Sequence, residues 1–455
     1  MLFLSGCVHF TSQPLSPTDT AAAFDSRSLT NENLRQFMET NGTTGEWPPQ
    51  VWPLRDLTFV ALYYHPDVAL ARAQWESAKA AIITAGERPN PSVTVTPGYD
   101  SQIPGTPSPW IVPVSIDIPI ETAGKRGYRM AQERHSAEGA YWKYVGTMWQ
   151  ARSNVRLALL NLQAADCTRT LLDDQVSAQS NVVHLLQGQV EAGEVSGFEM
   201  TQARVAFATT KVSREDAERQ YVQARVQLAK AMGISVKAIE GAQFASEDFD
   251  SMPTDLTAPE VRQQALLGRA DVRGALAQYA ASQSALQLAI AGQYPDVHLG
   301  PGYAWNTGSA GDNQWQLGLT VTLPVLNQNQ GAIAEAVAKR REAAASFVSV
   351  QAEAIGQIDS ALAGYQAALE EFRTAAALLT SLEERLRSVR SMEQAGEVDP
   401  LTLANATVEY STGALTRLDA LIKAQQALAQ LEDAAQSPLT LSEKAIQTAQ
   451  AKHEP

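Results

Sequence analysis

The sequence contains little of what catalytic and metal-binding sites are usually built from. Two cysteines in 455 residues exclude a disulfide framework and a thiolate zinc cluster. The motifs HExxH, GxSxG and GxxxxGK[ST] are absent, and AGKRG at 123–127 lacks the spacing and the hydroxyl of a phosphate loop. The six histidines are scattered, with none paired at i, i+3 or i+4. The sequence therefore predicts no enzyme, no cofactor and no metal site.

Positive charge and long hydrophobic runs are also scarce. The formal net charge of −14 and the pI near 5.0 argue against a nucleic-acid partner, because no basic stripe is present to replace phosphate counterions. No window holds the ~18 uncharged apolar residues that a transmembrane helix requires. A strand of a membrane barrel needs only ~10 residues of alternating character, so this absence leaves a membrane protein open.

Proline is missing from two long stretches, 120–252 and 325–399. Both are rich in Ala, Gln, Glu, Leu and Arg, which predicts long helices. Apolar residues in the second stretch step by four and three, the 3.5-residue period of a left-handed coiled-coil seam: Ile358, Leu362, Tyr365, Leu369, Phe372, Ala376 and Leu379. A helix from Lys125 to Ala192 would span on the order of 100 Å.

The word AGEV occurs twice, at 192–195 and at 395–398. Its neighbourhood repeats as well. PSVTVTPGY at 91–99 matches PDVHLGPGY at 295–303, and 65–74 matches 269–278, both at a shift of 204 residues. The chain is therefore an internal duplication, in which each half carries a helix, a strand, a hairpin loop, a strand, a very long helix, a turn and a long helix. A repeat of this length is a duplicated half-domain and not a solenoid unit.

The expected strands alternate apolar and polar residues with a period of two. One face is apolar and ends in tryptophan, as a lipid-facing barrel strand requires; its members are Trp110, Val112, Val114, Ile116 and Ile118, with Trp315, Leu317, Leu319, Val321 and Leu323 in the second half. A half-buried hairpin of a water-soluble protein shows the same alternation and is the alternative. Two strand pairs cannot close a barrel, and open edges cannot face lipid, so several copies would have to pool their strands.

Each AGEV turn divides into a helix end and a helix start. Gly193 and Gly396 permit the preceding helix to end. Ser196 and Asp399 are placed as N-caps of helices that begin at Gly197 and Pro400. We expect Glu194, Val195, Glu397 and Val398 to remain exposed.

Leu4-Ser5-Gly6-Cys7 resembles a bacterial lipobox, which predicts acylation of Cys7. The preceding stretch is too short for a signal peptide and lacks Lys or Arg, so we expect the true start codon upstream of Met1. The alternative is an unmodified cysteine.

In this order and duplicated, these features resemble the TolC-like outer membrane efflux proteins of Gram-negative bacteria, over about residues 55–438. PNP at 89–91, PIETAGKR at 119–126 and LPVLNQNQG at 323–331 carry the resemblance together with the two glycine turns. The first two of these motifs are similar especially to the outer components of heavy-metal efflux systems.

The resemblance implies a mainly α fold with a transmembrane β-barrel. Three copies would form a twelve-stranded barrel in the outer membrane, continued by a barrel of coiled-coil helices across the periplasm. The protein would be a passive conduit that exports metal ions or small toxic solutes. Its partners would be a periplasmic adaptor protein, an inner-membrane pump of the resistance-nodulation-division type and outer membrane lipid.

The resemblance also assigns residues. The adaptor would contact the two turns, at Gly193, Glu194, Val195, Ser196, Gly396, Glu397, Val398 and Asp399. The channel entrance would be formed by Glu397, Asp399 and Asn405, and lipid would contact Trp110, Val112, Val114, Trp315, Leu317, Leu319 and Val321. Some members of the family carry an acidic residue and an arginine, three positions apart, where this chain has Asn405 and Val408. Because this chain lacks that charge pair, the resemblance does not predict a charged lock at that level.

We expect five segments along the chain: a residual signal and lipobox (1–6), a lipid-anchored linker (7–55) with a short helix around Glu32–Glu39, a first repeat (56–250), a second repeat (251–438) and a tail (439–455). The expected strands lie at about 91–100, 110–119, 295–305 and 314–324. The alternative function is an envelope-associated or soluble coiled-coil scaffold without channel activity. It would leave the alternating strands without a lipid-facing role.

Overall fold

The structure is a computed structural model that describes residues 9–43, 45–99, 110–245, 252–253, 258–306 and 313–439. Cys7, the expected hairpin loop at 101–109, most of the second loop at 306–314 and nearly all of the tail lie outside these ranges.

The order of elements is the same in the two halves and confirms the predicted fold class. The first half contains α3 (Leu54–Tyr64), α4 (Pro66–Ala85), β2 (Ser92–Val95), β3 (Gly98–Tyr99), β4 (Trp110–Ile120), α5 (Lys125–Glu191) and α6 (Gly197–Met232). The second contains α7 (Ala258–Gly268), α8 (Ala270–Ala291), β6 (Val297–Asn306), β7 (Gln314–Val321), α9 (Gln330–Gln394) and α10 (Pro400–Ala435). A short helix η1 (Val236–Ile239) and strand β5 (Gln243–Phe244) follow α6.

The residues expected to form a linker contain more structure than one short helix. Besides α2 (Glu32–Thr40), at the expected place, they include α1 (Pro17–Asp25) and β1 (Val51–Trp52), which pairs with β5. Ser16 caps α1 and accepts a hydrogen bond from the Asp19 N–H, a local signal that the composition of the segment concealed. Leu34 and Met38 of α2 are buried, so tertiary packing holds this segment in place.

The single helix expected before the first strand, at about 57–86, is instead the two helices α3 and α4, because Pro66 interrupts it. The residue before a proline is driven out of the α region, and His65 accordingly has an extended backbone at ψ 125°. Gly233, at the end of α6, lies against this break with φ +72°, and a Cβ there would meet the His65 Cα at 2.8 Å. Only glycine fits at this close approach.

The chain forms two compact units that do not follow the boundary between the repeats. Unit 1 contains residues 1–69, 147–265 and 357–455, and unit 2 contains residues 70–146 and 266–356. Each unit combines segments from both halves, because the long helices α5 and α9 contribute residues to both units. Among the described residues, no helix is both long and apolar enough to cross a membrane.

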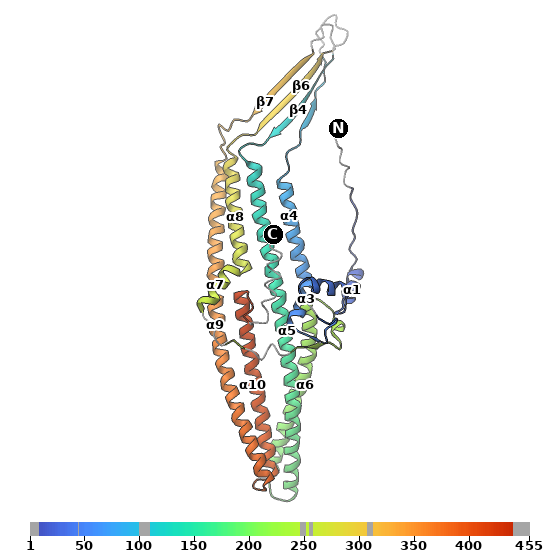
Figure 1. Ribbon diagram of the computed structural model, residues 1–455, viewed down its shortest axis with the longest axis vertical. Helices are drawn as coiled ribbons and strands as arrows, with labels where there is room; N and C mark the ends of the chain where they lie inside the picture. The colour runs from blue at the N-terminus through green and yellow to red at the C-terminus, as the bar shows by residue number, and fades with distance from the viewer. Residues whose placement is uncertain are drawn as a thin grey trace. The chain divides into compact units, whose positions relative to one another are not determined.

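Unit 2 contains an antiparallel sheet with the strand order β2-β4-β6-β7 (Figure 1), and β3 also pairs with β4. β2 and β3 are two parts of one strand position, interrupted at Pro97, which has no N–H to donate. The central pairing of β4 with β6 joins the two repeats. Its register places Val114 opposite Tyr303, and Tyr303 opposite Trp315 in β7.

Unit 1 contains the parts of α5 and α9 that lead into the two AGEV turns, together with α6 and α10. The predicted seam in α9 is confirmed at Ile358, Leu362, Tyr365 and Leu369, which are buried. Several of these pack with Leu428 and Leu431 of α10. Further along α9, Phe372, Ala376 and Leu379 are half-buried, and Ala375 takes the buried position.

Candidate functional site

The two AGEV turns have the same backbone geometry. At the first, the Gly193 N–H donates to the Val190 carbonyl at 3.0 Å and the Glu194 N–H to the Gln189 carbonyl at 2.9 Å. The second repeats the pattern, from Gly396 to Glu393 at 2.9 Å and from Glu397 to Met392 at 2.8 Å. This pair of bonds is a Schellman motif, which needs a left-handed residue. Gly193 and Gly396 supply it, with φ of +77° and +75°.

The caps that start the next helices are also as predicted. Ser196 Oγ accepts from the Glu199 N–H at 3.5 Å, and Asp399 Oδ1 accepts from the Thr402 N–H at 2.8 Å. Hydrogen bonds from the Thr402 hydroxyl and then from its backbone N–H hold the pKa of Asp399 below its ordinary value of 3.8. Asp399 is therefore an anion at neutral pH.

Glu194 and Glu397 are exposed, as expected, but Val195 and Val398 are half-buried, so the expectation of exposed valines was wrong. Val195 packs against a cluster that contains Leu186 of α5, Met200 of α6 and Leu401 of α10. Val398 packs against a second cluster, formed by α9 and α10. An apolar residue next to the end of a helix can fold back onto its last turns, and both valines do so.

Both turns lie at one end of unit 1, because the cluster around Leu186 joins α5, α6 and α10 there (Figure 1). Glu194, Glu397 and Asp399 therefore place exposed carboxylates at this end. Asn405 is exposed on α10, six residues after Asp399 and thus about 9 Å further along the helix. Val408 is half-buried in the cluster around Leu186.

Replacing Asp399 with alanine should destabilise unit 1 by about 1 kcal/mol, whereas asparagine, which keeps an accepting oxygen, should cost less. Because folding lowers the pKa of Asp399, its ionised carboxylate stabilises the folded state at any pH above the ordinary pKa. This stabilisation is lost only as the pH falls through the lowered pKa of the folded state. Thermal unfolding followed by circular dichroism at pH 7 measures the first effect. A loss as large for asparagine as for alanine would contradict the capping role.

The sheet in unit 2 has one continuous apolar face. Its register forms rows across the strands, such as Val95, Val114, Tyr303 and Trp315. Trp315, Leu317 and Leu319 are 84%, 73% and 67% exposed. Trp110 and Val114 are also exposed, whereas Val112 and Val321 are half-buried. Exposed apolar surface on this scale marks contact with a partner or with lipid.

The opposite face of the sheet carries small and polar residues. Gly302 faces Gln316, and His298 faces Thr320 across β6 and β7. The His298 Nδ1 lies 3.0 Å from Asp117 Oδ2. Among the described residues, no three or more His, Cys, Asp or Glu side chains form a group that could hold a metal ion.

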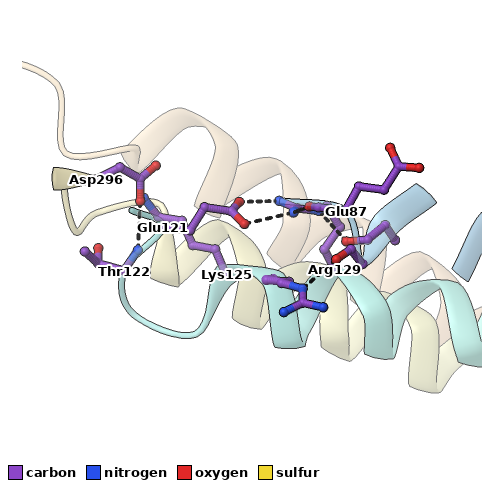
Figure 2. Close-up of polar contacts among 9 residues, drawn as sticks. Glu87, Glu121, Thr122, Lys125, Arg129 and Asp296 are labelled. Atoms are coloured by element: carbon purple, nitrogen blue, oxygen red, sulfur yellow. Dashed lines mark hydrogen bonds and ion pairs between the residues drawn. The ribbon is translucent and has the colours of Figure 1, made fainter. Parts of the chain in front are cut away.

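Polar contacts fix the junction between the sheet and the long helices (Figure 2). Asp296, just before β6, accepts from the Thr122 N–H at 2.9 Å and from Lys125 Nζ at 2.8 Å. Arg129 makes two bonds to Glu121, of 2.8 and 3.2 Å. Its Nε also donates to the Ala85 carbonyl at 2.9 Å, at the end of α4. The segment PIETAGKR and the nearby Arg129 therefore tie β4, α4, α5 and the start of β6 together.

The sequence showed this segment as a motif but did not reveal its contacts. Asp296 lies 171 residues from Lys125, so no local sequence pattern reveals that the two side chains meet. A second polar cluster, with Arg152, Arg156 and Glu432, also escaped prediction. These residues are buried in unit 1 and occur in stretches that look like ordinary helix surface.

Comparison with known proteins agrees with the duplication. A profile of the family described as outer membrane efflux protein matches residues 60–234 and again 261–436. Among curated proteins, the cobalt-zinc-cadmium resistance protein CzcC of Cupriavidus metallidurans is 23% identical over 283 residues, covering 62% of this chain and 65% of CzcC. The pyoverdine export outer membrane protein OpmQ of Pseudomonas aeruginosa is 26% identical over 246 residues, covering 53% of this chain and 43% of OpmQ.

Neither alignment reaches two thirds of the relative's length. Among solved structures, CusC superimposes with a TM-score of 0.67 at 17% sequence identity, covering 87% of this chain and 95% of CusC, which shows a shared fold. The family profile covers both repeats and most of the chain. The chain therefore belongs to the outer membrane efflux protein family.

Proposed function

We propose that this protein is an outer membrane channel of a tripartite efflux system, a passive conduit for metal ions or small toxic solutes. The observation that carries the proposal is the exposed apolar face of the sheet. Trp315, Leu317 and Leu319 would be costly to leave in water, and a lipid environment removes that cost. The small and polar residues on the other face suit a water-filled lumen.

The open edges of the sheet favour a homotrimer. β2 and β7 stand at the ends of the strand order and leave backbone donors and acceptors unpaired within one copy. Unpaired edges are not tolerated in hydrocarbon. Four strand positions per chain, pooled by three copies, form a closed barrel of twelve strands. The long helices continue this barrel into the periplasm, and acylated Cys7, outside the described residues, adds a lipid anchor.

The turn end of unit 1 is the proposed docking site for a periplasmic adaptor, which connects the channel to an inner-membrane pump of the resistance-nodulation-division type. Glu194 and Glu397 are exposed there, and the adjacent residues Gly193, Val195, Ser196, Gly396, Val398 and Asp399 complete the surface. Glu397 and Asp399, with Asn405 further along α10, line the entrance. Repeated threefold, these carboxylates make an acidic mouth that attracts cations.

The names of the two curated relatives indicate the solutes with which those two proteins are associated. CzcC is named for cobalt, zinc and cadmium resistance and OpmQ for pyoverdine export. The resemblance of PNP at 89–91 and of PIETAGKR to motifs of heavy-metal efflux outer components supports metal ions as one cargo class. The scaffold alternative leaves the apolar sheet face without a role and is not favoured.

Reconstitution tests the function. The purified full-length protein should form trimers in detergent and conduct ions in planar bilayers, and a water-soluble, non-conducting monomer would refute the proposal. A variant with alanine at Glu194 and Glu397 should still assemble and form open pores in planar bilayers, with a weaker preference for cations because Glu397 also lines the entrance. In a deletion strain, the same variant should fail to restore metal tolerance, because the adaptor no longer docks. If this variant fully restores metal tolerance, Glu194 and Glu397 are not part of the docking site.

A further inference from the structure

The polar face of the sheet carries a histidine and an aspartate in direct contact. The Nδ1 atom of His298, in β6, lies 3.2 Å and 3.0 Å from the two carboxylate oxygens of Asp117, in β4. Both side chains are accessible, with 40% and 46% of their surface exposed. The alternation of the strands places the pair on the same face as Thr320, which is directly opposite His298 in β7. The pair is therefore open to whatever fills the space on this side of the sheet.

The contact with Asp117 determines which ring nitrogen of His298 can act as a ligand. A carboxylate accepts hydrogen bonds and does not donate them, so the proton of a neutral imidazole is held on Nδ1, facing Asp117. The lone pair of the ring is then on Nε2. Histidines that bind metal ions usually have this arrangement, because a carboxylate on the other nitrogen orients the ring and makes the ligating nitrogen more basic.

The residues beside the pair leave room for a hydrated ion. In the register of β4, β6 and β7, Asp117 falls in the row of Gly300 and Gly318, which have no side chains. The nearest atom to a Cβ added at Gly300 would be the Gly318 carbonyl oxygen, at 3.6 Å, which is an ordinary contact. The backbone therefore does not require glycine at position 300, and its effect is to keep the surface next to Asp117 low and open.

A second carboxylate close in sequence to His298 is already bound by the protein. Asp296 accepts from the Thr122 N–H at 2.9 Å and from Lys125 Nζ at 2.8 Å (Figure 2). Lys125 therefore has a counter-charge of its own, and Asp117 is the carboxylate that orients His298. Since no three candidate ligands gather among the described residues, a metal ion at His298 takes one protein ligand and keeps water in its other positions.

We propose that Nε2 of His298 is a transient ligand for divalent transition-metal cargo, such as Zn²⁺, and that Asp117 is its positioning residue. Imidazole suits ions of this class, whereas Mg²⁺ and Ca²⁺ prefer oxygen ligands. A single ligand releases its ion readily, and conduction requires binding that is weak enough for the ion to leave. The inference rests on the proposed function, in which this face lines the lumen and three copies supply three such ligands.

Chemical modification tests the ligand atom directly. Diethyl pyrocarbonate acylates the unprotonated nitrogen of an accessible imidazole, and mass spectrometry of peptides measures the yield at each histidine. In the full-length protein in detergent, without a histidine tag, Zn²⁺ should protect His298, and Mg²⁺ at the same concentration should not. His184, an exposed histidine of α5, is the internal control. Half-protection of His298 should need about tenfold less Zn²⁺ than half-protection of His184, because a carboxylate orients only the former.

Two substitutions of Asp117 distinguish orientation of the ring from attraction by charge. Asp117→Ala removes the acceptor of the Nδ1 proton and should raise the Zn²⁺ concentration for half-protection of His298 about 10- to 100-fold. Asp117→Asn keeps an accepting oxygen without the charge and should cause a smaller loss. Equal losses for the two variants would overturn the positioning role, because attraction by charge alone would then explain the effect.

The ion selectivity of the channel provides a second measurement. Zn²⁺ bound at the lumen wall adds positive charge, so it should shift the reversal potential in a salt gradient toward anion preference, and by more than Mg²⁺ does. His298→Ala should remove this excess shift. The matched control is Thr320→Ala, in the neighbouring strand on the same face, which should keep it. An excess shift that survives in the His298→Ala protein would overturn the proposed ligand.

Failure of the inference and failure of the proposed function give different results. A channel that conducts, but in which Zn²⁺ protects His298 and His184 alike, overturns the metal contact and leaves the proposed function standing. A protein that neither assembles nor conducts overturns the proposed function, and with it the role of His298 in transit, whatever the protection of its ring.

Discussion

Replacing Glu432 with glutamine should destabilise unit 1 by about 3–5 kcal/mol, the usual cost of removing one partner from a buried ion pair. Glu432 is fully buried on α10 and accepts bonds from Arg152, at 3.1 Å, and from Arg156. Its second oxygen accepts from the Leu439 N–H at 2.9 Å. Without the carboxylate, two buried guanidinium groups on α5 lose their counter-charge.

The neighbouring carboxyl cannot fully replace it. Asp433 accepts from Trp149 at 3.0 Å and from Ser153, and burial raises the pKa of Asp433, which disfavours its charged form. Thermal unfolding in detergent, followed by circular dichroism, measures the loss. Glu409→Gln is the matched control, because Glu409 makes an exposed pair with Arg385 at 2.8 Å, and such pairs are worth about 0–1 kcal/mol.

A combined variant distinguishes destabilisation caused by the unbalanced buried charges from destabilisation caused by poorer packing. Arg152→Met and Arg156→Met, together with Glu432→Leu, remove all three charges while keeping similar volumes, and should recover most of the stability. If the Glu432→Gln variant unfolds at the same temperature as the unchanged protein, the buried cluster does not hold α10 against α5.

Leu319→Arg should cost up to about 4 kcal/mol of stability in the membrane, because Leu319 lies on the exposed apolar face of β7. It is directly opposite Leu299 of β6. The charged side chain would lie in hydrocarbon, whereas a water-soluble hairpin would tolerate it. The amount of heat-resistant trimer in the outer membrane fraction measures the effect in cells, and urea titration of protein in lipid vesicles measures it in vitro.

Thr320→Arg is the matched control one residue away. Thr320 is also exposed but on the opposite face, where it pairs with His298. An arginine in a wet lumen should barely affect stability and should change conductance instead. Equal losses for the two variants would contradict a lipid-facing role for the apolar face.

The structural features that could be predicted are those with a periodic or local signature in the sequence. The seven-residue seam at Ile358, the alternation around Leu317 and the caps at Ser196 and Asp399 depend on side chains close together in the chain, so short windows reveal them. The N-terminal helix α1 and the break at His65 were missed although their signals are local, because a capping serine and a single proline are weak against the composition around them.

The exposure of the valines in the turns was misjudged for a different reason. Val195 and Val398 lie in short polar turns, where the pattern alone favours solvent. Leu186, Met200 and Leu401 come from three different helices, and only their meeting creates the apolar surface that partly covers Val195.

The sequence by itself determined the duplication, the order of elements, the two glycine turns with their caps, and the separation of apolar from polar faces on the strands. Each follows from spacing along the chain. Only the tertiary structure decided that Asp296 meets Lys125 and that Glu432 is buried where it accepts hydrogen bonds from Arg152 and Arg156. Those outcomes depend on contacts between residues far apart in sequence, and a carboxylate buried on a helix has no periodic signature that distinguishes it from one facing water.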